Sequence, residues 1–273
     1  MAASRGGADV LTRRVIPCLD VRDGRVVKGI RFAGLRDAGD PAALAACYER
    51  QGADELVMLD VSATTEGRAA AIQTVRAIRS VISIPLTVGG GVRSVSHARD
   101  LLEAGADKVA VNTAATDRPE ILRELARQFG TQCTVIAIDA ARRAEETSGT
   151  SSPWQVMIRS GTVRLDLDAL EWARTAASLG AGEILLTSWD RDGTRSGYDL
   201  DLITAVSRAV RIPVIASGGA AMPLHLVEAL DAGAEAVLAA SIFHDGQHTV
   251  ADVKQALARA GVPVRLEHWG AGT

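Results

Sequence analysis

The two halves of this chain repeat the same short motifs at one fixed separation of 128 residues. The repeated motifs are Ile84-Pro85 with Ile212-Pro213, Gly90-Gly91 with Gly218-Gly219, Gly105-Ala106 with Gly233-Ala234, and Gly52-Ala53-x-Glu55 with Gly180-Ala181-x-Glu183. A repeat of this length is a half-domain rather than the unit of a solenoid. The sequence therefore predicts two equivalent half-barrels around one mouth.

Short strand-like runs alternate with longer, alanine-rich helical patterns along the whole chain. The predicted strands cover 14–20, 54–60, 84–88, 107–112, 132–139, 183–188, 213–217 and 235–240. The predicted helices lie near 41–51, 68–80, 94–104, 117–129, 167–179, 199–209, 222–232 and 249–260. Such alternation indicates a parallel sheet, and eight units in 273 residues indicate closure. We expect an α/β fold, a single (βα)8 TIM barrel with a half-barrel internal repeat.

Helix ends carry recognisable signals. Asp40-Pro41 and Asp117-Arg118-Pro119 each predict an N-cap followed by an early proline. The glycines of the repeated Gly-Ala pairs are expected just after helix C-termini.

Composition limits the compartment and the partners. The net charge of −3 gives no general attraction to nucleic acid or to membranes, and neither is expected as a partner. Three cysteines, Cys18, Cys47 and Cys133, show no metal-like spacing and indicate reduced thiols in a cytoplasmic protein. The sequence contains no apolar run long enough for a spanning helix.

The chain is expected to form one domain. Residues 1–12 lack the apolar segment of a signal peptide and are predicted to be a disordered leader. Residues 13–267 are predicted to form the barrel, and 268–273 a loose C-terminal tail.

Two segments are longer than the usual connections. Residues 22–39 are predicted to be a long loop after the first strand, and 140–165 a longer one with a hairpin near 154–165. Both follow the first strand of a half, so both are expected at the C-terminal mouth of the barrel. Lys28 lies in the first segment and could bring a cation to a phosphate, although a loop lysine is more often simply solvated.

Asp20 and Asp139 end the first and fifth predicted strands, which lie opposite each other in an eight-strand ring. Alternation along a strand places Asp20 on the same face as Arg14, Ile16 and Cys18, and Asp139 on the same face as Cys133, Val135 and Ala137. Two carboxylates across one pocket suit acid–base chemistry, because their surroundings can keep one protonated and one ionised. The alternative is that each aspartate only caps a loop.

Paired glycine turns follow the third and seventh predicted strands, at Gly89-Gly90-Gly91 and Ser217-Gly218-Gly219. Glycine lets backbone N–H groups approach an anion, and the mouth of this fold often binds phosphate after strands 7 and 8. Asn112-Thr113 and Ala240-Ser241 follow the adjacent strands. The sequence predicts two phosphate sites, unless these are only tight turns.

Charged residues also open four strands. Arg14, Glu55, Lys108 and Glu183 stand where neutral residues would be less costly, and inward charges must pair. They could form a closed ring at the base of the barrel, or be four solvated strand starts. The five histidines show no metal-ligand spacing, so no metal and no cofactor is expected, and His244 is expected to have a neutral structural role.

These motifs together resemble a known family. The motifs are Cys18-Leu19-Asp20-Val21, Leu35-Arg36-Asp37-x-Gly39-Asp40-Pro41, Thr87-Val88-Gly89-Gly90-Gly91, Ala137-Ile138-Asp139-Ala140, Asp190-Arg191-Asp192-Gly193-Thr194, Ala216-Ser217-Gly218-Gly219 and Ala239-Ala240-Ser241-x-Phe243-His244. From about residue 13 to 267 the chain closely resembles the cyclase subunit of imidazole glycerol phosphate synthase, from histidine biosynthesis. The resemblance implies a lyase that takes ammonia from a partner glutaminase and acts on a bisphosphorylated substrate.

The resemblance also implies roles for individual residues. Asp20 and Asp139 would be the acid–base pair, with Lys28 and Thr187 in support. The implied substrate and phosphate contacts are Gly91, Asn112, Thr113, Ser160, Asp192, Gly193, Gly218, Gly219, Ala240 and Ser241. Arg14, Glu55, Lys108 and Glu183 would be the ammonia gate. The glutaminase would dock at the N-terminal barrel face around Arg14, Asp107 and Lys108, to form a heterodimer.

One position departs from the family pattern, and two other functions compete. Relatives often carry a lysine two residues after the second aspartate, where this chain has Ala141 followed by Arg142 and Arg143. The nearest alternative is the sister isomerase of the same pathway, which opens the sugar of a similar bisphosphate. A catalytically silent barrel that only docks a glutaminase is the other.

Overall fold

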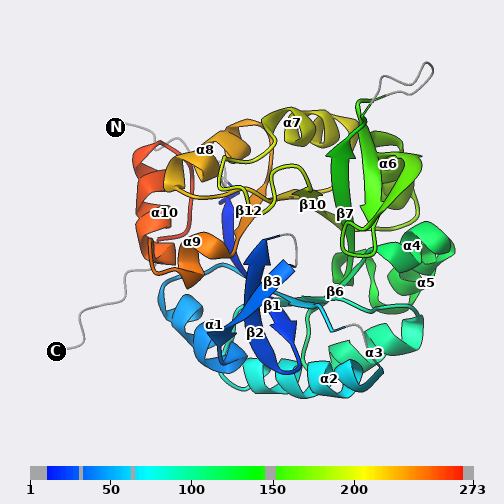
Figure 1. Ribbon diagram of the computed structural model, residues 1–273, viewed down its shortest axis with the longest axis horizontal. Coiled ribbons are helices and arrows are strands. Elements are labelled where there is room, and N and C mark those ends of the chain that lie inside the picture. The colour runs from blue at the N-terminus through cyan, green and yellow to red at the C-terminus, as the bar shows by residue number, and fades with distance from the viewer. Residues whose placement is uncertain (1–10, 31–32, 63–64, 145–151, 267–273) are drawn as a thin grey trace, which may run out of the picture.

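Eight parallel strands form the closed centre of the molecule (Figure 1). The computed structural model describes residues 11–30, 33–62, 65–144 and 152–266, so most of the predicted leader and the whole predicted tail lie outside the described residues. In ring order the strands are β1 (Arg14–Arg22), β4 (Leu56–Asp60), β5 (Leu86–Gly89), β6 (Lys108–Val111), β7 (Thr134–Arg142), β10 (Glu183–Ser188), β11 (Val214–Ser217) and β12 (Ala236–Ala239). Each pairs in parallel with the next, and β12 pairs with β1. The predicted (βα)8 barrel is confirmed.

An outer layer of helices surrounds these strands (Figure 1). They are α1 (Pro41–Arg50), α2 (Thr65–Arg79), α3 (Val95–Glu103), α5 (Glu120–Phe129), α6 (Ala169–Ser178), α7 (Leu200–Ala209), α8 (Pro223–Asp231) and α10 (Val250–Arg259). The predicted cap at Asp40 is confirmed, since its carboxylate accepts the Ala43 amide at 2.8 Å. The cap predicted at Asp117 is wrong, because Asp117 is the last residue of a separate short helix and α5 has no side-chain cap.

Two one-turn helices follow β6 and β12: α4 (Thr113–Asp117) and α9 (Ser241–His244). They begin 128 residues apart, as the internal repeat requires. Helices this short leave no periodic pattern in a sequence, so they were not among the predicted elements. A 3₁₀ turn, η1 (Thr131–Cys133), precedes β7, so Cys133 lies outside the strand in which it was predicted.

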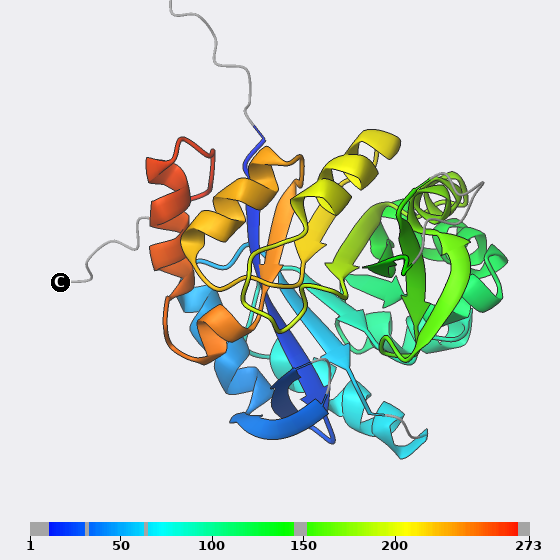
Figure 2. The same ribbon diagram turned by 45° about the horizontal axis from the view of Figure 1, so that its top comes forward.

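Both long segments contain hairpins. The first was predicted only as a loop, but β2 (Arg25–Ile30) and β3 (Ala33–Gly39) form an antiparallel pair that continues from the C-terminal end of β1 (Figure 2). Its residues have the β-rich composition that permits this, with three valines among positions 21–27. The hairpin predicted in the second segment is confirmed as β8 (Trp154–Ile158) and β9 (Val163–Asp168).

Two hydrophobic layers stabilise the barrel. The larger lies between the strands and the helices. The smaller fills the barrel interior with Ile16, Cys18, Val57, Ala110, Val135, Leu185, Ile215, Ala236 and Leu238. The predicted inward face of the first strand is therefore confirmed at Ile16 and Cys18, and that of the fifth at Val135.

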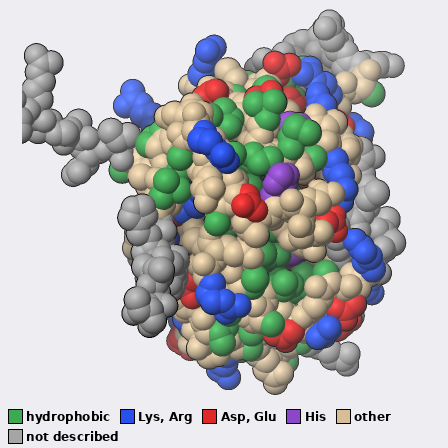
Figure 3. Space-filling view, turned by 90° about the vertical axis from the view of Figure 1, so that its left-hand side faces the viewer, with side chains coloured by type: hydrophobic (Ala, Val, Ile, Leu, Met, Phe, Trp, Pro, Cys, Tyr) green, Lys and Arg blue, Asp and Glu red, His purple; other side chains and the backbone are tan. Residues whose placement is uncertain are grey.

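One face of the molecule is mixed in character. On the side that carries α8 and α10, basic, acidic and apolar side chains are interspersed (Figure 3). Within the described ranges, no helix is both long and apolar enough to cross a bilayer.

Candidate active site

Asp20 and Asp139 stand near the C-terminal ends of β1 and β7, which are four strands apart in the ring. Asp20 follows Ile16 and Cys18 on the interior face of β1, and Asp139 follows Val135 in the same way on β7. Strand alternation therefore turns both carboxylates toward the barrel axis. Both are half-buried, which suits a pocket open to substrate at one side.

The two carboxylates have different neighbours and different acidities. Burial and, to a smaller extent, the charge of Asp192 raise the pKa of Asp20 to about 7, while the weak contact with the Cys18 thiol lowers it slightly. Burial also raises the pKa of Asp139, but hydrogen bonds from Asn112 and Thr187 limit the rise to about 6. The Asn112 amide donates to Asp139 at 2.9 Å. Between these values Asp139 is mostly ionised while Asp20 mostly keeps its proton.

The side chain of Asn112 has one hydrogen-bond acceptor that is not satisfied at this site. Its side-chain nitrogen is used by Asp139, while its Oδ1 is buried and meets no donor within the part of the chain that the structure describes. A buried acceptor without a donor costs free energy, so a bound molecule that donates a hydrogen bond is favoured here. This places Asn112, predicted as a substrate contact, directly beside Asp139.

Glycine turns lie at equivalent places on the two halves of the mouth. Gly91 and Gly219 have φ values of +65° and +100°, in the region that favours glycine. In the described structure, the N–H groups of Gly91, Gly218 and Gly219 donate to no protein acceptor. A Cβ on Gly219 would lie 2.2 Å from the Gly197 carbonyl oxygen. A Cβ on Gly91 would meet nothing within 4 Å, so only the second turn is crowded. The amides of both turns form two cradles suited to anions.

The other predicted phosphate contacts lie on segments that follow neighbouring barrel strands. Thr113 and Ser241 begin α4 and α9, immediately after Asn112 and Ala240. The β8–β9 turn that contains Ser160 reaches the first half, where the Arg159 amide donates to the Thr113 hydroxyl at 3.1 Å. In the loop after β10, Gly193 has φ +73°, whereas the Asp192 amide already donates to the Ser188 carbonyl at 2.9 Å. The carboxylate of Asp192, rather than its amide, therefore acts on the mouth, through its charge on both aspartates.

Neither arginine after the second aspartate replaces the missing lysine. Ala141 is buried, and Arg142 turns outward to pair with Asp201 at 3.0 Å and to stack on Trp154. Arg143 pairs with Asp166 at 2.9 Å. Lys28 lies on β2 opposite Arg36, but its side chain is outside what the structure describes. The β2–β3 hairpin is joined to the loop after α9 by an ion pair between Arg36 and Asp245, 3.2 Å apart.

A ring of four charges closes the opposite end of the barrel. Arg14 pairs with Glu55 at 2.8 Å and with Glu183, while Lys108 pairs with Glu55 at 3.0 Å and with Glu183 at 2.8 Å. The Thr87 hydroxyl also donates to Glu55 at 2.7 Å. The charges predicted to be inward are paired in this four-charge ring, with both glutamates buried.

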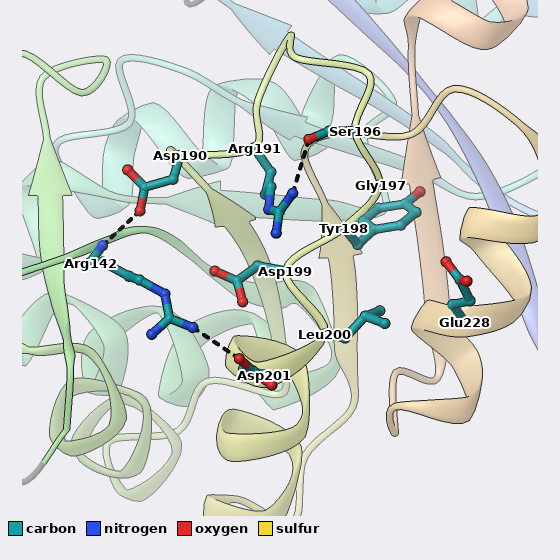
Figure 4. Close-up of a pocket in the computed structure, with 10 residues that line it drawn as sticks. All are labelled: Arg142, Asp190, Arg191, Ser196, Gly197, Tyr198, Asp199, Leu200, Asp201 and Glu228. Atoms are coloured by element: carbon teal, nitrogen blue, oxygen red, sulfur yellow. Dashed lines mark hydrogen bonds and ion pairs between the residues drawn. The ribbon is translucent and has the colours of Figure 1, made fainter.

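A separate cavity of about 650 Å³ lies on the rim outside the mouth (Figure 4). It is lined by Arg142, Asp190, Arg191, Ser196, Gly197, Tyr198, Asp199, Leu200, Asp201 and Glu228. Neither Asp20 nor Asp139 reaches it, and most of its charged side chains already bond to one another or to nearby backbone. Among the described residues, no group of three or more His, Cys, Asp or Glu side chains could hold a metal ion.

The closed barrel and its mouth define a class. Carboxylates of raised pKa and anion cradles, all at the C-terminal ends of barrel strands, are the features of a (βα)8-barrel enzyme. The chain belongs to a family described as histidine biosynthesis protein, whose model matches residues 14–249. That family includes both the cyclase and the isomerase, so the chain is a histidine-biosynthesis enzyme of one of these two types.

Proposed function

We propose that this chain is the cyclase subunit of imidazole glycerol phosphate synthase. It would use ammonia to convert phosphoribulosyl-formimino aminoimidazole carboxamide ribonucleotide into imidazole glycerol phosphate and an aminoimidazole carboxamide ribotide. The observation that carries the choice over the isomerase is the four-charge ring at the far end of the barrel from the aspartates. An isomerase acts on one substrate that enters at the mouth and needs no second entrance.

The two aspartates suit the proton transfers of this reaction. Protons must leave the ammonia nitrogen as its bonds to carbon form, and the ribulosyl carbonyl oxygen must gain protons to leave as water. The departing aminoimidazole nitrogen must also gain a proton. Asp139, the more acidic of the pair, is the better base, and Asp20 with a pKa of about 7 is the better acid. Thr187 supports this assignment because its hydroxyl hydrogen-bonds to Asp139.

A substrate with a phosphate at each end fits the duplicated mouth. One phosphate would bind at Gly91, Asn112, Thr113 and Ser160, and the other at Gly193, Gly218, Gly219, Ala240 and Ser241. The middle of the molecule would then lie between Asp20 and Asp139, which β1 and β7 carry on opposite sides. Burial, together with the negative charge of Asp192, raises the pKa of Asp20 and so favours its protonated form.

The four-charge ring would be the gate through which ammonia enters. Between it and the aspartates the interior is apolar, from Ile16 and Val57 to Leu185. An apolar interior favours neutral ammonia over ammonium, because burying a lone charge is costly. Entry needs only a transient opening of one ion pair.

The partner glutaminase would dock on the N-terminal face around the ring, near Arg14, Asp107 and Lys108. Leu11, Val81 and Leu266 border this face and are 87%, 43% and 48% exposed. Exposed leucine and valine beside charged groups are suited to a protein interface.

The test is a pair of assays on the purified protein. With ammonium salt and no partner, we expect the bisphosphate to yield imidazole glycerol phosphate, and we expect no isomerase turnover. Asp20→Asn and Asp139→Asn should each abolish product formation. Isomerase turnover without cyclase turnover would establish the sister enzyme instead, and unchanged activity in both variants would remove the aspartates from the mechanism.

A further inference from the structure

His244, the last residue of α9 in the second half, links that helix to β1 and α1 of the first half. Its Nε2 meets the backbone carbonyl of Cys18 on β1 at 3.0 Å, and its Nδ1 meets the hydroxyl of Tyr48 on α1 at 2.5 Å. The rings of Tyr48 and His244 also touch, with centroids 5.8 Å apart. Figures 1 and 2 both show α9 beside α1 and next to β1.

The two hydrogen bonds fix the form of the neutral imidazole. A carbonyl oxygen only accepts, so Nε2 carries the proton, and Nδ1 accepts from the Tyr48 hydroxyl. Tyr48 is 3% exposed, which keeps water from competing for that bond. The ring is therefore held in one tautomer and one orientation.

Each end of this link leads to a part of the active site. Cys18 is two residues before Asp20 on the same strand, and α9 is a single turn that begins at Ser241, beside the second anion cradle. A one-turn helix cannot bend, so anchoring His244 sets the distance between that cradle and Asp20. The equivalent residue of the first half is Thr116, whose hydroxyl donates to the Thr113 carbonyl within its own short helix and, among the described residues, makes no bond to β1 or β7. The anchor therefore exists on the Asp20 side of the mouth.

We propose that His244 is a positioning residue, which holds the second anion cradle at a fixed distance from Asp20. Tyr48 fixes the tautomer and the orientation of the His244 imidazole. The inference rests on the proposed binding of a bisphosphate across the mouth. A misplacement of about 1 Å at a reacting centre can cost about 100-fold in rate. Loss of the anchor should thus lower kcat while the cradle itself still binds phosphate.

The test compares four variants with the wild type. His244→Leu removes both hydrogen bonds, Tyr48→Phe removes only the one to Nδ1, and His244→Gln keeps a donor for the Cys18 carbonyl. Thr116→Val is the matched control in the other half. Each is assayed for kcat and KM on whichever of the two reactions the wild type catalyses, and for inorganic phosphate affinity by calorimetry without turnover.

We expect kcat to fall about 100-fold in His244→Leu and about 5-fold in Tyr48→Phe, with His244→Gln and Thr116→Val near the wild type. KM for the bisphosphate and phosphate affinity should change less than about 3-fold. Parallel loss of phosphate affinity and KM would overturn the inference, because His244 would then build the cradle. An unchanged kcat in His244→Leu would also overturn it.

Should His244→Leu fail to fold, Tyr48→Phe decides, and an unchanged kcat there overturns the inference. Isomerase turnover by the wild type would refute the proposed cyclase and leave this test intact. A wild type that turns over neither substrate contradicts the proposed function and this inference together.

Discussion

At the scale of single residues, the two aspartates show how equal side chains acquire unequal roles. Both are partly withdrawn from water, which favours the neutral acid. Asp139 receives hydrogen bonds from Asn112 and Thr187 that favour its ionised form, whereas Asp20 has the thiol of Cys18, a weak donor at 3.9 Å. The pKa values of the two aspartates thus differ mainly because their hydrogen-bond donors differ, and less because of burial.

The raised pKa of Asp20 carries a stability cost that can be measured. The folded state keeps this proton up to about pH 7 while the unfolded chain loses it near pH 4, so the contribution to stability falls as pH rises between these values. At pH 8, Asp20→Asn should raise the free energy of unfolding by about 1–3 kcal/mol, and by less at pH 5. Denaturant unfolding at both values checks this, with exposed Asp201→Asn as control. A destabilised variant at pH 8 would refute the assignment.

The same acidities predict a pH dependence of rate. The active form has Asp139 ionised and Asp20 protonated, so kcat/KM should be highest between about pH 6 and 7 and fall on both sides. The measurement is made at a constant concentration of free ammonia, which removes the titration of the nucleophile. A profile that is flat from pH 5 to 8 would contradict these roles.

At the scale of elements, the glycine turns depend on backbone that other residues cannot adopt. Gly219→Ala would combine φ +100° with a Cβ 2.2 Å from the Gly197 carbonyl, so the cradle must shift. We expect KM for the bisphosphate to rise at least about 10-fold. Gly261→Ala, with φ +83° and open space around its Cβ, is the control for backbone strain alone. Equal KM values in both variants would show that the cradle at Gly219 does not bind substrate.

Elements differed in how far the sequence could predict them. The eight barrel strands and the β8–β9 hairpin follow from alternation and turn residues, which are local signals. The one-turn helices α4 and α9 could not be predicted, because one turn leaves no period. The N-cap predicted at Asp117 was wrong for the same reason, since that residue ends α4. The His244 anchor joins residues 226 positions apart in the chain, so no local pattern contains it.

At the scale of the whole molecule, the two groups of charged side chains lie at opposite ends of the barrel axis. The mouth holds the aspartates and cradles, and the base holds the four-charge ring, with apolar side chains between them. The 128-residue repeat predicted this plan, since duplication implies paired cradles. Strand parity predicted the ring, because Arg14 shares a face with Asp20.

The ring supplies a prediction about the assembled enzyme. Glu183→Gln removes a partner of both Arg14 and Lys108 and should destabilise the protein by about 2–4 kcal/mol, because a buried pair is broken. If the ring is the ammonia gate, glutamine-dependent activity with the partner should change by a larger factor than ammonium-dependent activity without it. Equal factors in the two assays would leave the ring a purely structural feature.

The most direct measurement is a crystal structure of Asp139→Asn with the bisphosphate bound. We predict one phosphate at Gly91 and Thr113, the other at Gly219 and Ser241, and the middle of the ligand between residues 20 and 139. A ligand with one phosphate in solvent, or with its middle away from both of those residues, would contradict the account.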